Sequence, residues 1–174
     1  FMPLDHPRHL SLMSMLEKYY YSRFYCGVYL QFHDMDKYLK YHHTDYLVDH
    51  WEKQFNQDFS KKNIWGHPDD QLFAKSMLDL DKKHNKIQKS RLDILLTIST
   101  HNPYLVPNQE KYIGQISSEL KKRGKKNKFE QFVEQNIEKF AACRDTDEAI
   151  RNEVREMKKR KDYSNTIFFI LGDQ

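Results

Sequence analysis

The sequence contains little cysteine, which limits the kinds of site it can form. Only Cys26 and Cys143 are present, and they lie too far apart in the chain to give the close spacing of a cysteine metal site. A single disulfide between them is allowed, but nothing in the sequence requires it. A cysteine-based metal centre is therefore not expected.

Long apolar runs are also missing. No stretch approaches the roughly 20 apolar residues of a membrane-spanning helix, and no signal peptide opens the sequence. The chain begins at Phe1 rather than at Met, so we expect it to be part of a longer protein. For that reason, the absence of a targeting segment says little about where the protein works.

Charge of one sign is in only small excess. The 29 Lys and Arg residues outnumber the 25 Asp and Glu residues by four, too few to indicate a nucleic-acid partner. Aromatic residues make up 14% of the chain and must be buried somewhere, which argues against long disorder. With 174 residues, the chain can form one domain, and we assign residues 1–174 to a single partial domain.

Two apolar runs predict strands buried on both faces. One is Leu92–Ser99, and the other is Thr166–Leu171, whose five consecutive apolar residues stand between a polar turn and Gly172. Continuous short runs of this kind are typical of parallel sheets covered on both sides. Two shorter strands are predicted at Arg23–Gly27 and Asp45–Val48.

Helical spacing of apolar residues separates these strands. It predicts helices over Leu10–Tyr20 with Ser11 as N-cap, over Phe32–Tyr41, from Pro68 to Leu80, and as one long element over Phe129–Arg160. Polar composition predicts loops at Asp49–Gly66 and Glu119–Lys128 and a linker at Lys82–Arg91. Strands alternating with helices predict an α/β fold with a mostly parallel sheet flanked by helices.

Polar side chains follow both apolar runs. His101 comes after the first run and Asp173 after the second, and in a parallel sheet both loops open at the same edge. A carboxylate suits Mg²⁺ or Mn²⁺, and a histidine can donate to a phosphate or sulfate oxygen. On these grounds His101 and Asp173 are candidates for one ligand site, although a structural histidine and a turn-forming aspartate are equally compatible with the pattern.

Several stretches carry a family resemblance, in the family's order. The sequence resembles the sulfatase-like phosphoglycerol transferases, the lipoteichoic acid synthase type within the alkaline phosphatase superfamily, at residues 96–104, 145–150 and 162–174, and more weakly at 1–5, 23–35 and 65–70. The resemblance implies a partial alkaline phosphatase or sulfatase-like domain. It also implies a parent enzyme at the extracytoplasmic face of the cell envelope that acts on a phosphate or sulfate ester of a lipid head group, using a threonine nucleophile and Mn or Mg.

The resemblance also assigns roles to individual residues. The family's metal-binding aspartate falls on Asp173, the next metal ligand on Gln174 instead of histidine, and the substrate-binding histidine on His101. In the loop after the early strand, Tyr29 replaces an aspartate and Gln31 an asparagine. These three departures from the family pattern weaken the expectation of a complete metal site.

The nucleophile and another acidic metal ligand belong to family segments upstream of Phe1. We therefore expect this chain alone to show no turnover, to bind no Mn or Mg, and to self-associate through uncovered apolar surface. Two readings remain open for the parent: a metal-dependent transferase or hydrolase, and a degenerate relative that binds a head group or partner without chemistry. A basic run at Lys121–Lys126 is either a solvated loop or a contact for a phosphate-rich surface.

Overall fold

The computed structural model describes residues 9–49, 65–83, 89–124 and 127–172. Its strands are β1 (Tyr20–Cys26), β2 (Tyr46–Val48) and β3 (Ser90–Leu96). Its α-helices are α1 (Leu12–Leu16), α2 (Met35–Tyr41), α3 (Asp69–Lys83), α4 (Gln109–Arg123), α5 (Lys128–Gln135) and α6 (Ile137–Met157), with 3₁₀ turns at Phe32–Asp34 and Tyr163–Asn165. None of the helices in these ranges is both long and apolar enough to cross a membrane.

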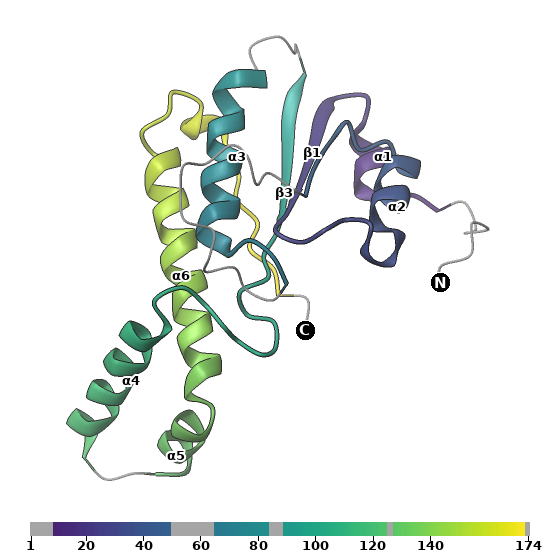
Figure 1. The fold of residues 1–174 in the computed structure, drawn as a ribbon. Coiled ribbons are helices and arrows are strands. Elements are labelled where there is room, and N and C mark those ends of the chain that lie inside the picture. The colour runs from purple at the N-terminus through teal and green to yellow at the C-terminus, as the bar shows by residue number, and fades with distance from the viewer. Residues whose placement is uncertain (1–8, 50–64, 84–88, 125–126, 173–174) are drawn as a thin grey trace.

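The three strands form a parallel sheet in the order β2-β1-β3. Helices α1 and α2 cover one face, and α3 with the upper part of α6 covers the other (Figure 1). This is the α/β architecture that the sequence predicts, with a parallel sheet between helical layers. The predicted strands at Arg23–Gly27, Asp45–Val48 and Leu92–Ser99 are confirmed as strands, and their ends differ from the predicted ones by at most three residues.

The central strand β1 buries both of its faces. Phe24 and Cys26 point into the cluster under α1 and α2, while Tyr25 packs with Val48 and Leu72 on the α3 side. This alternation follows from the two-residue period of a strand. Strand β3, at the edge, is only half-buried along most of its length, so the predicted burial on both faces is wrong there.

The predicted terminal strand at Thr166–Leu171 is wrong as well. These residues are not part of the sheet, and Ile167, Phe169 and Leu171 are 78%, 81% and 87% exposed. An apolar run becomes a strand only when another strand pairs with it, and within the described residues this segment forms no ladder with β1, β2 or β3.

The helix predictions need three corrections. The helix predicted at Leu10–Tyr20 ends at Leu16 because β1 begins at Tyr20, although Ser11 does cap it. The single helix predicted at Phe129–Arg160 is two helices, broken at Asn136, whose backbone leaves the helical region. The predicted loop at Glu119–Lys128 and the linker at Lys82–Arg91 are partly helical instead, since α4 continues to Arg123 and α3 to Lys83. Most of the predicted Asp49–Gly66 loop lies outside the described residues.

Helices α4 and α5 form, with the lower half of α6, an arm that extends away from the sheet (Figure 1). The arm has its own apolar cluster, built from buried residues of all three helices: Tyr112, Ile116, Val133 and Ala141. Helix α6 has 21 residues, so it is about 30 Å long and belongs to both parts of the molecule.

Candidate functional site at the carboxyl edge of the sheet

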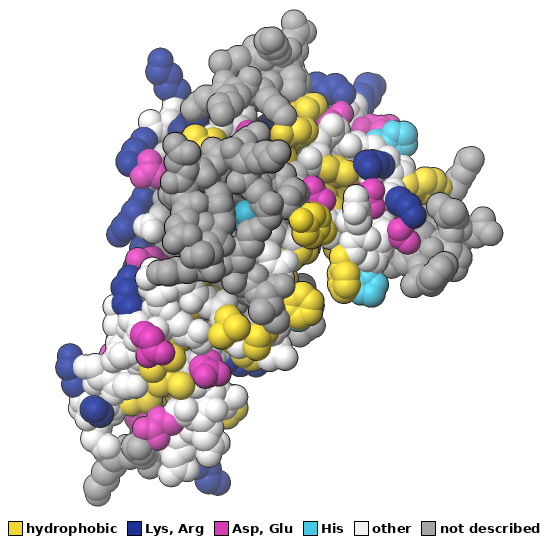
Figure 2. Space-filling model, in the orientation of Figure 1, with side chains coloured by type: hydrophobic (Ala, Val, Ile, Leu, Met, Phe, Trp, Pro, Cys, Tyr) yellow, Lys and Arg dark blue, Asp and Glu magenta, His cyan; other side chains and the backbone are white. Residues whose placement is uncertain are grey.

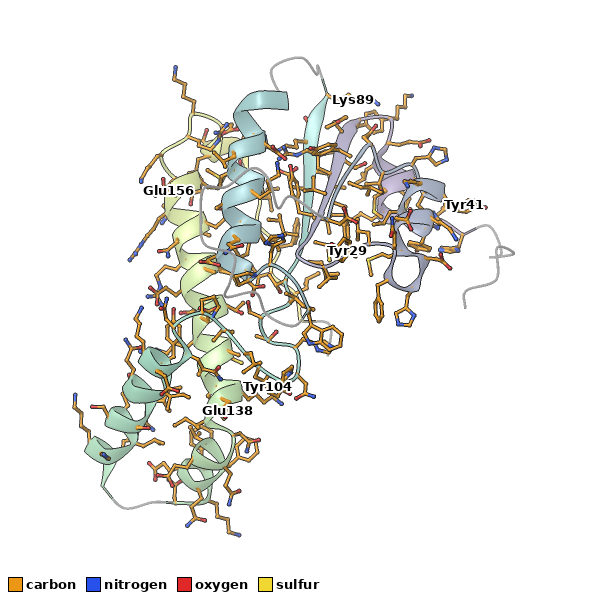
Figure 3. The ribbon with its side chains drawn as sticks, in the orientation of Figure 1. Tyr29, Tyr41, Lys89, Tyr104, Glu138 and Glu156 are labelled. Carbon is orange, nitrogen blue, oxygen red and sulfur yellow. The ribbon has the colours of Figure 1, made fainter. Side chains whose placement is uncertain are left out.

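The carboxyl ends of the three parallel strands lie at one edge of the sheet, at the bottom in Figure 1. Loops after β1 and β3, the segment that leads into α3, and the extended segment 166–172 all reach this edge (Figure 1). Tyr29 and Tyr104 come from the first two loops, and Lys89 marks the opposite edge at the start of β3 (Figure 3). Ligands of open α/β sheets bind at the carboxyl edge.

Two glycines allow the loop after β1 to touch the segment before α3. His67 donates its backbone N–H to the carbonyl of Gly27 at 2.9 Å. A Cβ at Gly66 would lie 2.1 Å from the Gly27 oxygen, and the φ of Gly66 is +151°, a conformation that L side chains rarely adopt. No other residue fits this crossing without displacing the backbone.

Asp69 joins three elements through a fully buried carboxylate. Its Oδ1 accepts the backbone N–H groups of Ile98 and Ser99 at 2.8 and 3.1 Å, and its Oδ2 accepts the hydroxyl of Thr146 at 2.7 Å. The Ser99 hydroxyl in turn accepts the N–H of Asp69 at 3.1 Å. The start of α3, the loop after β3 and helix α6 are therefore fixed to one another at this carboxylate.

His101 lies three residues beyond Ile98 on this anchored loop and is exposed. Its Nδ1 is 2.8 Å from the carbonyl oxygen of Asn102, which also accepts the Nε1–H of Trp65 at 2.7 Å. The Trp65 and His101 rings meet edge to face at 4.7 Å between centroids. A carbonyl oxygen only accepts hydrogen bonds, so Nδ1 carries the proton and Nε2 is left facing away from this contact.

Tyr29 lies at the same edge, in the loop after β1, and is 54% exposed. The loop is held by Asp49, whose carboxylate accepts the backbone N–H of Leu30 at 3.0 Å. Gln31 precedes the 3₁₀ turn and is also exposed. Tyr29 and Gln31, two of the three positions at which the sequence departs from the family pattern, thus face solvent beside the strand ends and are not part of the core.

Asp173 and Gln174, predicted as metal ligands, lie outside the described residues. Within the ranges 9–49, 65–83, 89–124 and 127–172, no group of three or more His, Cys, Asp or Glu side chains could hold a metal ion. The described residues therefore do not fit a metal by themselves, and the metal assignment stays a prediction.

Asp145 lies at the junction of the sheet and the arm. It is 8% exposed, and its Oδ2 has no hydrogen-bond partner among the described residues. Burial, with the nearby Asp70 and Asp69 carboxylates, raises the pKa of Asp145 to about 7. This acid is close to half-protonated at neutral pH, which limits the repulsion inside the acidic cluster.

The relationship to known proteins agrees with this geometry. The model of the family described as Sulfatase matches residues 3–174, nearly the whole sequence. The chain belongs to the sulfatase family. No curated protein matches it in sequence.

Two solved structures share the fold of this sulfatase-family chain. The lipoteichoic acid synthase LtaP from Listeria monocytogenes is 18% identical and superposes with a TM-score of 0.60 over 84% of this chain. A protein of the alkaline phosphatase superfamily from Vibrio parahaemolyticus is 20% identical, with a TM-score of 0.61 over 86%. The chain spans 32% of the length of either structure. The partial alkaline phosphatase-like fold is thereby confirmed.

Sequence reasoning missed Asp69 and Thr146, although both lie in stretches that carry the resemblance. The weak match at 65–70 contains Asp69, the match at 145–150 contains Thr146, and the match at 96–104 contains the two amides that Asp69 binds. Three stretches far apart in sequence thus meet at one carboxylate. The proline before two aspartates at the start of a helix was the only local signal.

Proposed function

We propose that this chain forms part of a metal-dependent sulfatase-like enzyme that hydrolyses or transfers a phosphate or sulfate ester. The ester would belong to a lipid head group such as phosphoglycerol, and the complete protein would work at the extracytoplasmic face of the cell envelope. Family membership and the likeness to a lipoteichoic acid synthase support this proposal. In it, Asp173 and Gln174 are metal ligands, Mn or Mg is the metal, and His101 binds the substrate.

The observation that carries the proposal is the position of His101. Its loop leaves the carboxyl edge of the sheet and is anchored by the buried Asp69, yet the imidazole itself remains exposed. A side chain that is held in place but open to solvent at this edge is suited to contact a ligand. A structural histidine would instead be expected to lie inside the fold.

The fixed tautomer of His101 defines which groups it can recognise. Because Nδ1–H is bound to the Asn102 carbonyl, Nε2 of the neutral ring is an acceptor. It therefore suits a hydroxyl of a glycerol-type head group. When protonated, the same nitrogen donates and suits a phosphate or sulfate oxygen.

A second candidate function is head-group binding without turnover. Tyr29 favours it, since it supplies no negative charge at a position where the family has an aspartate, and Gln31 replaces the shorter amide of the family's asparagine. Gln174 favours it too, because a neutral amide oxygen is a weak ligand for a divalent ion. The fold and the position of His101 are compatible with both functions.

One experiment on the complete protein that contains this chain distinguishes the two functions. Turnover of a chromogenic phosphodiester and of a chromogenic sulfate ester is measured with Mn²⁺, alongside binding of glycerol phosphate. For the enzyme, His101→Ala should raise KM about tenfold or more, whereas His43→Ala, an exposed histidine paired with Glu17, should change it less than twofold. Binding that requires His101 without any turnover would favour the degenerate relative. If His101→Ala loses neither property, the role of His101 in substrate binding is overturned. If the unchanged protein shows neither turnover nor binding, both functions are overturned.

A further inference from the structure

Positive charge is concentrated at the far end of the arm. Six of the eight residues from 121 to 128 are Lys or Arg, and none is acidic. Since the whole chain carries +4 and this stretch carries +6, the remaining residues together carry −2. The basic residues of this stretch that the structure describes are all exposed, in the last turn of α4 and at the start of α5: Lys121, Lys122, Arg123 and Lys128, here called the basic tip.

The basic tip differs from the rest of the arm in its pairing. Along α4 and α6, three cations have acidic partners: Lys111 with Glu148, Arg144 with Glu119, and Arg151 with Asp147. Within the described residues, none of the four basic-tip side chains forms an ion pair. The charges of these four side chains are therefore not neutralised by ion pairs, whereas the groove between the helices is lined by charges of both signs.

Two exposed phenylalanines lie beside the basic tip. Phe129 and Phe132 are 60% and 52% exposed, and they share one side of α5 because they are three residues apart. Val133, one turn after Phe129, packs into the arm's apolar cluster. Phe129 lies at the border of the groove beside it, and the ring of Phe132 meets that of Phe140 at 6.1 Å between centroids, so each ring has one side against the arm and the other open to solvent. Large apolar side chains next to uncompensated cations are the composition of segments that bind a membrane interface.

The direction in which the arm extends is also compatible with such a contact. It extends past the carboxyl edge of the sheet, on the side where the candidate site opens (Figure 1). The lower end of the arm carries Lys and Arg side chains around its tip (Figure 2).

We propose that the basic tip, together with Phe129 and Phe132, docks this protein on an anionic lipid bilayer. The lysines and Arg123 would lie over acidic head groups, and the two rings would enter the boundary between head groups and acyl chains. A single-stranded nucleic acid fits less well, because such ligands follow a positively charged groove, and the groove of this arm is lined by ion pairs. This proposal does not depend on the proposed catalytic function, because the binding of the chain to vesicles tests it without any measurement of activity.

The test is co-sedimentation with vesicles. The chain is mixed with phosphatidylcholine vesicles containing about one third phosphatidylglycerol and, separately, with pure phosphatidylcholine vesicles. The exposed run at 167–171 would attach to both kinds of vesicle alike, so the difference between them is the readout. Each cation at an anionic surface contributes about fivefold to partitioning, so the triple variant K121Q/K122Q/R123Q should bind anionic vesicles roughly 100-fold more weakly.

The matched control lies at the opposite end of α6. Lys158 and Lys161 are also exposed basic residues, and no exposed phenylalanine is close to them in sequence before Phe168. The variant K158Q/K161Q should bind within threefold of the unchanged chain, and Phe129→Ala should weaken binding about tenfold at unchanged circular dichroism. Equal binding to both kinds of vesicle would overturn the proposal. Equal losses in the triple variant and the control variant would do the same, as would preferential binding to a soluble oligonucleotide.

Discussion

Replacing Asp69 with alanine should destabilise the protein strongly. The substitution removes the acceptor for the backbone N–H groups of Ile98 and Ser99 and for the Thr146 hydroxyl. Each buried donor left without a partner costs about 1–3 kcal/mol, so the two amides together predict a loss of about 4 kcal/mol. That is a large part of the roughly 5–15 kcal/mol by which a domain of this size is stable.

Asp69→Asn is the matched variant. Its amide oxygen can still accept the two backbone N–H groups, and its NH₂ group can face Thr146, whose hydroxyl can turn to accept. We therefore expect this variant to lose only about 1 kcal/mol. Thr146→Val removes the hydroxyl at nearly constant volume, and Thr146→Ser keeps it, so the pair isolates the hydrogen bond between Asp69 of α3 and Thr146 of α6.

Urea unfolding followed by circular dichroism gives the free energies, and hydrogen exchange at Ile98 and Ser99 shows whether the loop opens locally. A double-mutant cycle between Asp69→Asn and Thr146→Val should give a coupling of about 1 kcal/mol. If Asp69→Ala costs less than about 1 kcal/mol, or if the exchange of the two amides is unchanged, the carboxylate does not hold the loop and our account of how His101 is positioned fails.

Three further predictions concern acidity, association and metal. Between pH 4 and 7 the unfolded chain has lost the proton of Asp145, while the folded chain retains it. The free energy of unfolding should therefore fall as the pH rises through this window, by at most about 4 kcal/mol, and should level off above it. Burial also raises the pKa of Glu153 to about 7, so Asp145→Asn should reduce the pH slope of the thermal-melting midpoint across that window without abolishing it, and an unchanged slope would contradict the assignment. The exposed side chains of Ile167, Phe169 and Leu171 predict self-association. Light scattering should show a molecular mass that rises with protein concentration, and Phe169→Lys should reduce this rise. A monomer at every concentration would refute the prediction. Calorimetric titration of Mn²⁺ into this chain should show no micromolar binding, and binding abolished by Asp173→Ala would instead reveal a more complete metal site.

The sequence predicts elements well where local pattern and tertiary role coincide. The short aromatic run that ends in Gly27 and the proline before α3 predicted elements that the structure contains, β1 and α3, because each signal depends on neighbours in the chain. Helix α4 was missed at Glu119–Arg123 because its polar residues hide the helical period of Tyr112, Ile116 and Leu120. Composition alone cannot separate a solvated loop from the exposed side of a helix.

Other features depend on contacts that no local pattern contains. The run at 166–171 has the composition of a strand, but a strand also needs a partner at hydrogen-bonding distance. The partners of Asp69 are distant in sequence: Ile98 lies 29 positions away and Thr146 lies 77 positions away. Only the fold brings these residues together. His101, by contrast, could be predicted as a candidate from the sequence. A polar residue that follows a parallel strand lies at the carboxyl edge of the sheet, where ligands of such sheets bind.

The chain between residues 49 and 67 is tied at both ends to the same short loop. Asp49 binds the backbone of Leu30, and His67 binds the backbone of Gly27, across the close approach that Gly66 allows. Changes in length between these two ties add only slowly to the entropy of closing the loop. The contacts of Asp49 and His67 therefore fix the two points at which the chain leaves and rejoins this edge of the sheet.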